Sequence, residues 1–232
     1  MKKVLYVLHQ KTSVAGDVGN KFKNRGFSAD IIRPPLGDIL PTDLTPYSAI
    51  VIFGGPMSVN DDEQFIRDEI NWMKQIIESN IPFLGICFGA QILAKYLGCD
   101  VLKNKDDLAE IGFYEIKPVG EGDNIFKKQN IFYQFHTEGF EIPSNCQLLA
   151  RGDLFKNQAF KYQNCYALQF HPEVNFFLHL RWIFLVLKKK PTVLFRKGSQ
   201  NLFYQLILRL KYNKSISLWL DSFLDNYLLA QK

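Results

Sequence analysis

The chain of 232 residues has four cysteines, Cys87, Cys99, Cys146 and Cys165, and their spacing fits neither a metal site nor a disulfide framework. No secretory leader is recognisable, so we expect a reduced, cytoplasmic setting. The most apolar late run, residues 176–187, is 12 residues long and contains a histidine and an arginine. A membrane span needs roughly 20 apolar residues, so we predict a core helix here and no membrane contact.

Acidic residues are missing from one long stretch. From Arg181 to Lys214 the chain has nine Lys or Arg and no Asp or Glu, whereas the remainder has 19 basic and 23 acidic residues. A run of this kind is usually a solvated face, and a docking surface for an acidic partner is the alternative. Because the chain lacks a zinc-binding pattern and an aromatic platform for single strands, we expect no nucleic acid partner.

Apolar runs and helical patterns alternate through the first hundred residues. Short apolar runs predict strands at residues 3–8, 27–32, 49–53 and 82–86. Helices are predicted at residues 14–25, 61–79 and 88–97. Asp61 or Asp62 is expected to cap the second helix. This alternation indicates an α/β fold with a doubly wound, mostly parallel sheet and helices on both faces.

The pattern changes after Gly98. Short segments between turns predict antiparallel strands at the sheet edge or over its end, at residues 111–116, 131–135, 148–150, 159–162 and 166–170. Helices return from Val174, and Ser215 is predicted to cap a final helix. Its apolar stripe either closes the core or forms a homodimer contact. We expect a domain over residues 1–190 and a helical extension over residues 191–232 packed on it.

The predicted strand at 82–86 runs into the helix at 88–97 through Cys87. Gly85 and Gly89 stand two residues before and two after it. A lone cysteine is most often a buried structural residue, but flanking glycines at a strand-to-helix turn are typical of a nucleophile elbow. The cramped turn admits only small residues at those positions. The helix N-terminus would favour a thiolate and offer N–H groups to a developing oxyanion.

A cysteine nucleophile needs a base, and the base needs an orienting group. His171 ends an apolar run, and Glu173, two residues later, can hold its tautomer and stabilise the imidazolium. His136 is the second candidate for lining a site. His9 could lie at the same sheet edge but has no carboxylate nearby in the sequence. His179 falls within a predicted helix, where packing or surface exposure is the simpler interpretation.

Five motifs carry a family resemblance: GGPMSV at 54–59, GICFGAQ at 85–91, EIGFYEI at 110–116, FHTEGFEIP at 135–143 and QFHPEV at 169–174. In this order and spacing, the chain resembles the class I, triad-type glutamine amidotransferases. It is most similar to the stand-alone proteins that resemble the glutaminase domain of GMP synthase. The resemblance implies a flavodoxin-like, mostly parallel sheet with antiparallel edge strands and C-terminal helices.

The resemblance also implies roles for individual residues. Cys87 would be the nucleophile, His171 the general base and acid, and Glu173 the residue that orients the imidazole. The backbone N–H groups of Gly55 and Phe88 would form the oxyanion hole, because the family places the Gly-Gly-Pro turn opposite the elbow.

Further residues would line the glutamine pocket. The resemblance implies this role for Gly54, Gln91 and Phe135. His136 matches a histidine common near the pocket in the family, without a catalytic role. Related enzymes often have Asp where this chain has Glu138, and this departure leaves the role of the loop open.

The implied reaction hydrolyses the side-chain amide of glutamine to glutamate and ammonia through a cysteine thioester, with no metal or other cofactor. Because the chain lacks a Walker loop and a serine-glycine-glycine ATP pattern, an ammonia acceptor would lie on a synthase partner subunit or be absent. Two alternatives stay open. A γ-glutamyl hydrolase acting on a peptide or amine would use the same three residues, and pocket shape would separate it. A non-catalytic regulatory module is less compatible with an intact triad.

Overall fold

An eight-stranded sheet forms the centre of the computed structural model, which describes residues 2–230. The strand order is β2-β1-β3-β4-β12-β11-β10-β7. The bounds are β1 Lys3–Val7, β2 Ser28–Ile32, β3 Ala49–Ile52, β4 Phe83–Ile86, β7 Lys117–Pro118, β10 Gln147–Arg151, β11 Asn157–Tyr162 and β12 Cys165–Leu168. The pairings from β2 through β12 are parallel, and those from β12 to β7 are antiparallel. The predicted α/β class is therefore confirmed.

Two further pairs of strands lie beside this sheet. One pairs β5 (Val101–Lys103) with β9 (Glu138–Phe140), and the other pairs β6 (Glu110–Glu115) with β8 (Ile131–His136). The predicted strands at 111–116 and 131–135 thus form a sheet of their own instead of joining the edge of the main sheet.

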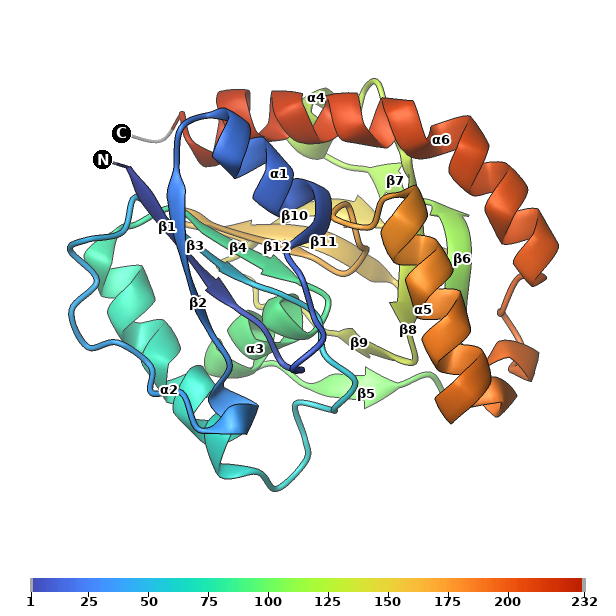
Figure 1. The fold of residues 1–232 in the computed structure, drawn as a ribbon, viewed down its shortest axis with the longest axis horizontal. Coiled ribbons are helices and arrows are strands. Elements are labelled where there is room, and N and C mark those ends of the chain that lie inside the picture. The colour runs from blue at the N-terminus through green and yellow to red at the C-terminus, as the bar shows by residue number, and fades with distance from the viewer. Residues whose placement is uncertain (1, 231–232) are drawn as a thin grey trace.

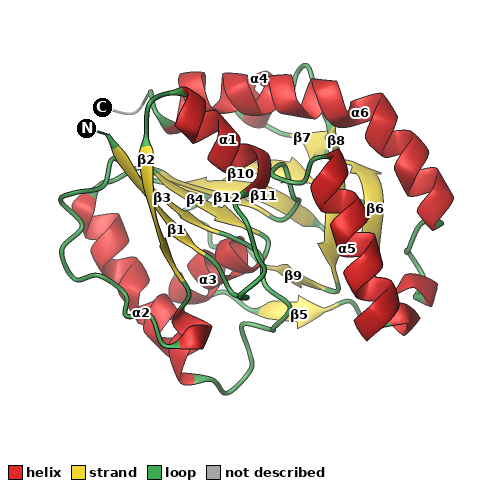
Figure 2. Cartoon of the chain, in the orientation of Figure 1, coloured by secondary structure: helices red, strands yellow, loops and turns green. Residues whose placement is uncertain are grey.

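Helices cover both faces of the main sheet (Figures 1 and 2). They are α1 Gly16–Asn24, α2 Gln64–Ser79, α3 Phe88–Tyr96, α4 Gly122–Ile125, α5 Phe176–Lys189 and α6 Leu202–Phe223. Short 3-10 turns occupy Pro34–Leu36 and Pro191–Phe195, and a π-helical turn at Leu224–Leu228 follows α6. In Figure 1, α1 and α6 lie above the sheet and α2 and α3 below it. Each layer closes its own apolar core against the sheet.

Three local predictions are wrong. Helix α2 begins at Gln64 after Glu63, and no side chain caps it, because the Asp61 carboxylate instead accepts from the Ser58 N–H in the preceding loop. Strand β12 is shorter than predicted and runs parallel to β4, so it belongs to the parallel half of the sheet. Ser215 lies inside α6, where its hydroxyl bonds to the Tyr212 carbonyl.

The N-cap of α6 is Asn201, whose side-chain oxygen accepts from the N–H groups of Phe203 and Tyr204. Helix α3 also differs from its expected amphipathic pattern, because residues 88–94 are buried on every side. Strands β5, β7 and β9 and helix α4 had no prediction. Among residues 2–230, no helix combines the length and apolarity that crossing a membrane requires.

The apolar stripe of α6 closes the core of its own chain. The Trp219 ring stacks on Phe126 and Phe223, with interplanar angles of 14° in both pairs, and its Nε1–H donates to the Ile125 carbonyl at 2.8 Å. Leu220 and Leu224 are fully buried in the same cluster as the strands. We therefore propose that residues 191–232 extend the domain of residues 1–190 and do not fold separately.

We predict that Trp219→Ala lowers the free energy of unfolding by about 3–5 kcal/mol, because it removes a stacked ring and leaves a cavity. Leu218→Ala, at a neighbouring position that is 59% exposed, is the matched control and should stay within about 0.5 kcal/mol of wild type. Chemical denaturation followed by tryptophan-independent far-UV circular dichroism measures both. Equal stabilities for the two variants would contradict this account of α6.

Candidate active site

The turn between β4 and α3 holds Cys87 in a strained backbone conformation. Its φ of 51° and ψ of −104° lie where side-chain-bearing residues are rare, and its N–H donates to the Leu168 carbonyl at 2.7 Å. A Cβ on Gly89 would stand 2.1 Å from the Ile52 oxygen, and one on Gly85 would stand 2.6 Å from the Gly89 oxygen. The sequence prediction that small residues must flank the cysteine is confirmed.

His171 and Glu173 follow β12, the parallel neighbour of β4. Parallel strands end at the same edge of a sheet, so this pairing brings His171 to the elbow. The His171 Nδ1 lies 2.8 Å from Glu173 Oε1, and both side chains are 3% exposed. The His171 backbone N–H donates to the Tyr133 carbonyl at 2.8 Å. Among the described residues, no oxygen or nitrogen atom bonds to His171 Nε2.

Gly54 lies between His171 and Cys87. A Cβ at this position would stand 2.8 Å from His171 Cε1 and 3.5 Å from Cys87 Cβ. A side chain here would therefore push the imidazole away from the thiol. Gly54 thus lies beside Cys87 and His171, and its lack of a side chain lets the two groups approach.

The surroundings of His171 decide its protonation. Burial by itself would lower the pKa of this imidazole, but the charges of Glu173 and Cys87, and hydrogen bonds to both, raise the pKa well above its ordinary value of 6.5. The imidazolium is therefore the stable form at neutral pH when Cys87 carries a negative charge. This arrangement can supply a proton to a leaving group bound beside Cys87.

The two predicted oxyanion donors sit on either side of the elbow. Gly55 follows Gly54 in the loop after β3, and Phe88 is the first residue of α3. In the part of the chain that the structure describes, neither backbone N–H donates to a protein oxygen. Both donors are available to a substrate oxygen.

Gln91 and Phe135 are each linked to the site through one intervening residue. The Gln91 amide donates to the Glu138 carbonyl at 3.2 Å and to Gln169 Oε1 at 3.3 Å. The Gln169 amide in turn points its Nε2 at Cys87 Sγ, 3.6 Å away. Phe135 packs against Trp182 with ring centroids 6.0 Å apart. The role of Gln169 had no prediction, although the residue begins the QFHPEV motif.

Trp182, from α5, closes the site and was also missed by the sequence. Its ring stands edge-on to His171 at a centroid distance of 5.0 Å. The cavity beneath it has a volume of about 30 Å³ and is lined by Leu8, Ser13, Val14, Phe53, Gly54, Glu173 and Trp182. This space holds one or two water molecules and is too small for a glutamine side chain.

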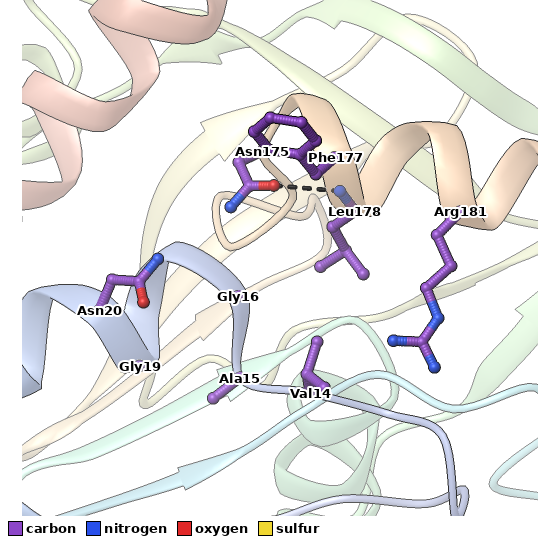
Figure 3. A pocket seen from close by; sticks show the side chains of 9 residues that line it. All are labelled: Val14, Ala15, Gly16, Gly19, Asn20, Asn175, Phe177, Leu178 and Arg181. Atoms are coloured by element: carbon purple, nitrogen blue, oxygen red, sulfur yellow. Dashed lines mark hydrogen bonds between the residues drawn. The ribbon is translucent and has the colours of Figure 1, made fainter.

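A larger open groove adjoins this cavity, and Val14 lines both (Figure 3). The groove has a volume of about 420 Å³ and runs between the start of α1 and the start of α5. Asn20 and Asn175 present amides on its walls, and Arg181 extends along its α5 side. Neither the groove nor the small cavity is lined by Cys87 itself.

The remaining histidines are all buried and paired. His9 contacts Glu69 of α2, a carboxylate 60 positions away that the sequence could not associate with it. His136 Nε2 lies 2.9 Å from Glu110 Oε2. His179 bonds to Gln205. Burial, together with the positive charge of Arg209, lowers the pKa of His179 to about 4.

Glu138, the departure from the family pattern, links two loops of the site. Its Oε2 accepts from the Ser58 hydroxyl at 2.7 Å. Ser58 belongs to the GGPMSV loop and Glu138 to β9, so this hydrogen bond joins the GGPMSV loop to the segment that follows His136. The longer side chain therefore has a structural partner here.

Comparisons with known proteins identify the family of the chain. The family model for "Glutamine amidotransferase class-I" matches residues 8–185. The glutamine-hydrolyzing GMP synthase of Flavobacterium psychrophilum is 31% identical over 143 residues, covering 59% of this chain and 27% of that protein. In Pyrococcus abyssi, one subunit of a glutamine-hydrolyzing GMP synthase is 35% identical over 133 residues, covering 55% of this chain and 66% of that protein.

Among solved structures, a glutamine amidotransferase from Thermotoga maritima is 28% identical, with a TM-score of 0.87, and the match covers 98% of both chains. The chain spans about a quarter of the bacterial GMP synthase that it matches and about two thirds of the archaeal protein. The likeness to the Thermotoga protein, in contrast, extends over the C-terminal helices as well.

We predict that Glu173→Gln lowers the pKa of His171, because it removes the negative charge that opposes the effect of burial. Titration of the His171 Cε1–H signal by NMR measures the shift. Glu69→Gln, which removes a carboxylate paired with another histidine, is the control and should leave the His171 titration unchanged. A His171 signal that titrates at the same pH in Glu173→Gln and wild type would contradict this assignment.

Proposed function

The chain belongs to the class I glutamine amidotransferases, and we propose that it hydrolyses the side-chain amide of glutamine through a thioester on Cys87. One observation carries the proposal. His171 has its Nδ1 fixed by Glu173 at 2.8 Å and its Nε2 unbonded among nearby oxygens and nitrogens, and the Cys87 thiol acts on the same ring. A base with one nitrogen anchored by a carboxylate and the other left to a neighbouring, strained cysteine is the arrangement that acyl transfer requires.

In the first half of the reaction, the Cys87 thiolate attacks the side-chain carbonyl carbon of glutamine. The carbonyl oxygen becomes an oxyanion that accepts from the N–H groups of Gly55 and Phe88. His171 donates its Nε2 proton to the amide nitrogen, the C–N bond breaks, and ammonia leaves. The γ-glutamyl group stays on sulfur as a thioester, and His171 is neutral.

In the second half, His171 takes a proton from a water molecule that attacks the thioester carbonyl. The same N–H groups hold the oxyanion, the C–S bond breaks, and glutamate leaves as Cys87 returns to a thiolate beside an imidazolium. Glu173 stabilises the imidazolium. Because Cys87 is only 6% exposed and the Trp182 ring lies against His171, we infer that Trp182 moves outward when glutamine enters.

We predict that purified protein releases ammonia from glutamine and that Cys87→Ala abolishes the release. Hydroxylamine should trap the thioester as γ-glutamyl hydroxamate in the wild type and not in Cys87→Ala. Glutamate dehydrogenase coupling measures glutamate, and γ-glutamyl amines serve as rival substrates. Turnover of γ-glutamyl amines alone would replace this proposal with a γ-glutamyl hydrolase. A wild type that is as inert as Cys87→Ala toward every substrate would support the non-catalytic alternative.

The C-terminal helices present a basic apolar surface, which we define as the exposed faces of α5, α6 and the segment between them. Five of its apolar side chains are between 64% and 87% exposed: Phe177, Phe184, Phe195, Phe203 and Leu210. Lys188, Lys189 and Lys190, at the C-terminal end of α5, are also exposed. Exposed apolar patches of this kind mark interaction sites, and the absence of acidic residues from 181–214 fits an acidic partner.

We propose that this surface docks an acidic synthase subunit that receives the ammonia. The curated relative from Pyrococcus abyssi is named as one subunit of a GMP synthase, which supports a partner chain for this protein. Helix α5 also carries Trp182, whose ring lies against His171. Binding of a partner to α5 would therefore change how easily Trp182 moves away from the site.

We predict that replacing Lys188, Lys189 and Lys190 by Glu weakens binding to the remaining subunit of a two-subunit GMP synthase by about 10-fold or more at low salt, through charge repulsion. The control replaces Lys105, Lys127 and Lys128 by Glu, which changes the net charge equally at exposed sites elsewhere. Calorimetry at two salt concentrations measures both. Equal affinities for the two triple variants would contradict this docking surface.

A further inference from the structure

A second histidine–carboxylate pair packs against the GGPMSV loop that follows β3. His9, just beyond the end of β1, places its Nε2 3.2 Å and 3.1 Å from the two carboxylate oxygens of Glu69 on α2. Both side chains are 0% exposed. Removing two such polar groups from water costs several kcal/mol, which their close pairing offsets.

The hydrogen-bond partners of His9 fix where its hydrogens lie. Its Nδ1 is 3.3 Å from the carbonyl oxygen of Gly54, which can only accept a hydrogen bond. Nδ1 must therefore carry a hydrogen and donate it. A carboxylate also accepts, so Nε2 donates to Glu69 on the other side of the ring, and the two contacts together fix the ring orientation.

The Gly54 carbonyl and the Gly55 N–H belong to the same peptide unit. A trans peptide is planar, and its C=O and N–H point in opposite directions. Fixing the carbonyl toward His9 therefore aims the N–H away from His9, toward the side where Gly54 adjoins Cys87 and His171. A hydrogen bond to the carbonyl also polarises the peptide and makes its N–H a stronger donor.

His9 also touches both halves of the proposed oxyanion hole. A Cβ on Gly55 would stand 3.0 Å from His9 Cβ, so the loop backbone packs directly on the histidine. On its other side the imidazole meets the Phe88 ring edge-on, with centroids 4.6 Å apart. The side chain thus spans the two residues whose N–H groups face the reacting oxygen.

We propose that His9, held by Glu69, is a positioning residue that orients the Gly54–Gly55 peptide and strengthens its N–H as an oxyanion donor. The inference rests on the proposed function, because it assigns the pair to the hole that the reaction uses. The pair makes no contact with substrate and exchanges no proton with it. Its contribution is felt when negative charge develops on the carbonyl oxygen.

Two isosteric substitutions separate this role from simple packing. The amide of His9→Asn can place a donor where Nδ1 was, and so keeps the bond to Gly54. The amide of His9→Gln reaches the former position of Nε2 and loses that bond. Both are made in a Glu69→Gln background, so that neither leaves a buried carboxylate without a partner.

We expect His9→Gln/Glu69→Gln to lose about 10- to 100-fold in kcat, a smaller effect than deleting an oxyanion donor outright, with KM little changed. His9→Asn/Glu69→Gln should stay within about 3-fold of Glu69→Gln alone. Affinity for the γ-aldehyde analogue of glutamine, which forms a tetrahedral adduct with Cys87, should fall in step with kcat. Alkylation of Cys87 by iodoacetamide, which generates no oxyanion, should not change.

Equal losses in the two double variants, or alkylation that falls as far as kcat, would overturn the inference and assign the pair to packing. An active wild type whose His9→Gln/Glu69→Gln variant is unimpaired would overturn the inference and leave the proposed function intact. A wild type inert toward glutamine and γ-glutamyl amines would overturn both. If the Gln double variant does not fold, His9→Gln with the native Glu69, to which the new amide donates, is compared with His9→Asn/Glu69→Gln instead.

Discussion

The close approach of backbone around Cys87 is the constraint on which the site depends. Helix α3 packs so tightly on β3 that the Gly89 Cα lies against the Ile52 carbonyl, and Gly85 lies against the Gly89 carbonyl. Any side chain at these two positions would lift the helix from the sheet. With the helix held down, the chain has only a strained turn with φ of 51° in which to join it to β4. That turn places the Cys87 side chain at the end of the parallel strands, where it is 6% exposed.

Sheet topology supplies the rest of the site. Strand β4 lies between β3 and β12, and all three run parallel, so the segments after them meet at one edge. The loop after β3 brings Gly54 and Gly55, the turn after β4 brings Cys87, and the segment after β12 brings His171. This is the edge at which parallel α/β sheets bind their ligands in general. Residues that are far apart in the sequence are therefore still held in defined relative positions, because each follows a strand that is paired with its neighbour.

The predictability of each part follows from whether its signal is local. Continuous apolar runs predict the strands, and the glycines two residues before and after Cys87 predict the elbow. Glu173 could be paired with His171 because two positions separate them. His9 and Glu69 meet through β1 and α2, and nothing local records that contact. Ser215 was misread because a serine before an apolar stripe also occurs inside a helix, where its hydroxyl bonds the preceding turn.

The C-terminal helices belong to the site although α6 lies beyond the matched family region. Arg209 of α6 is 1% exposed, and its guanidinium lies 5.4 Å from the Tyr133 ring centroid. Tyr133 in turn accepts the backbone N–H of His171 through its carbonyl. Burial lowers the pKa of Arg209 to about 10, against the opposing effect of Tyr133, Asp17 and Glu173. The negative charge of Glu173 thus acts on Arg209 of α6, and the helix that closes the core also places a buried positive charge near the candidate base.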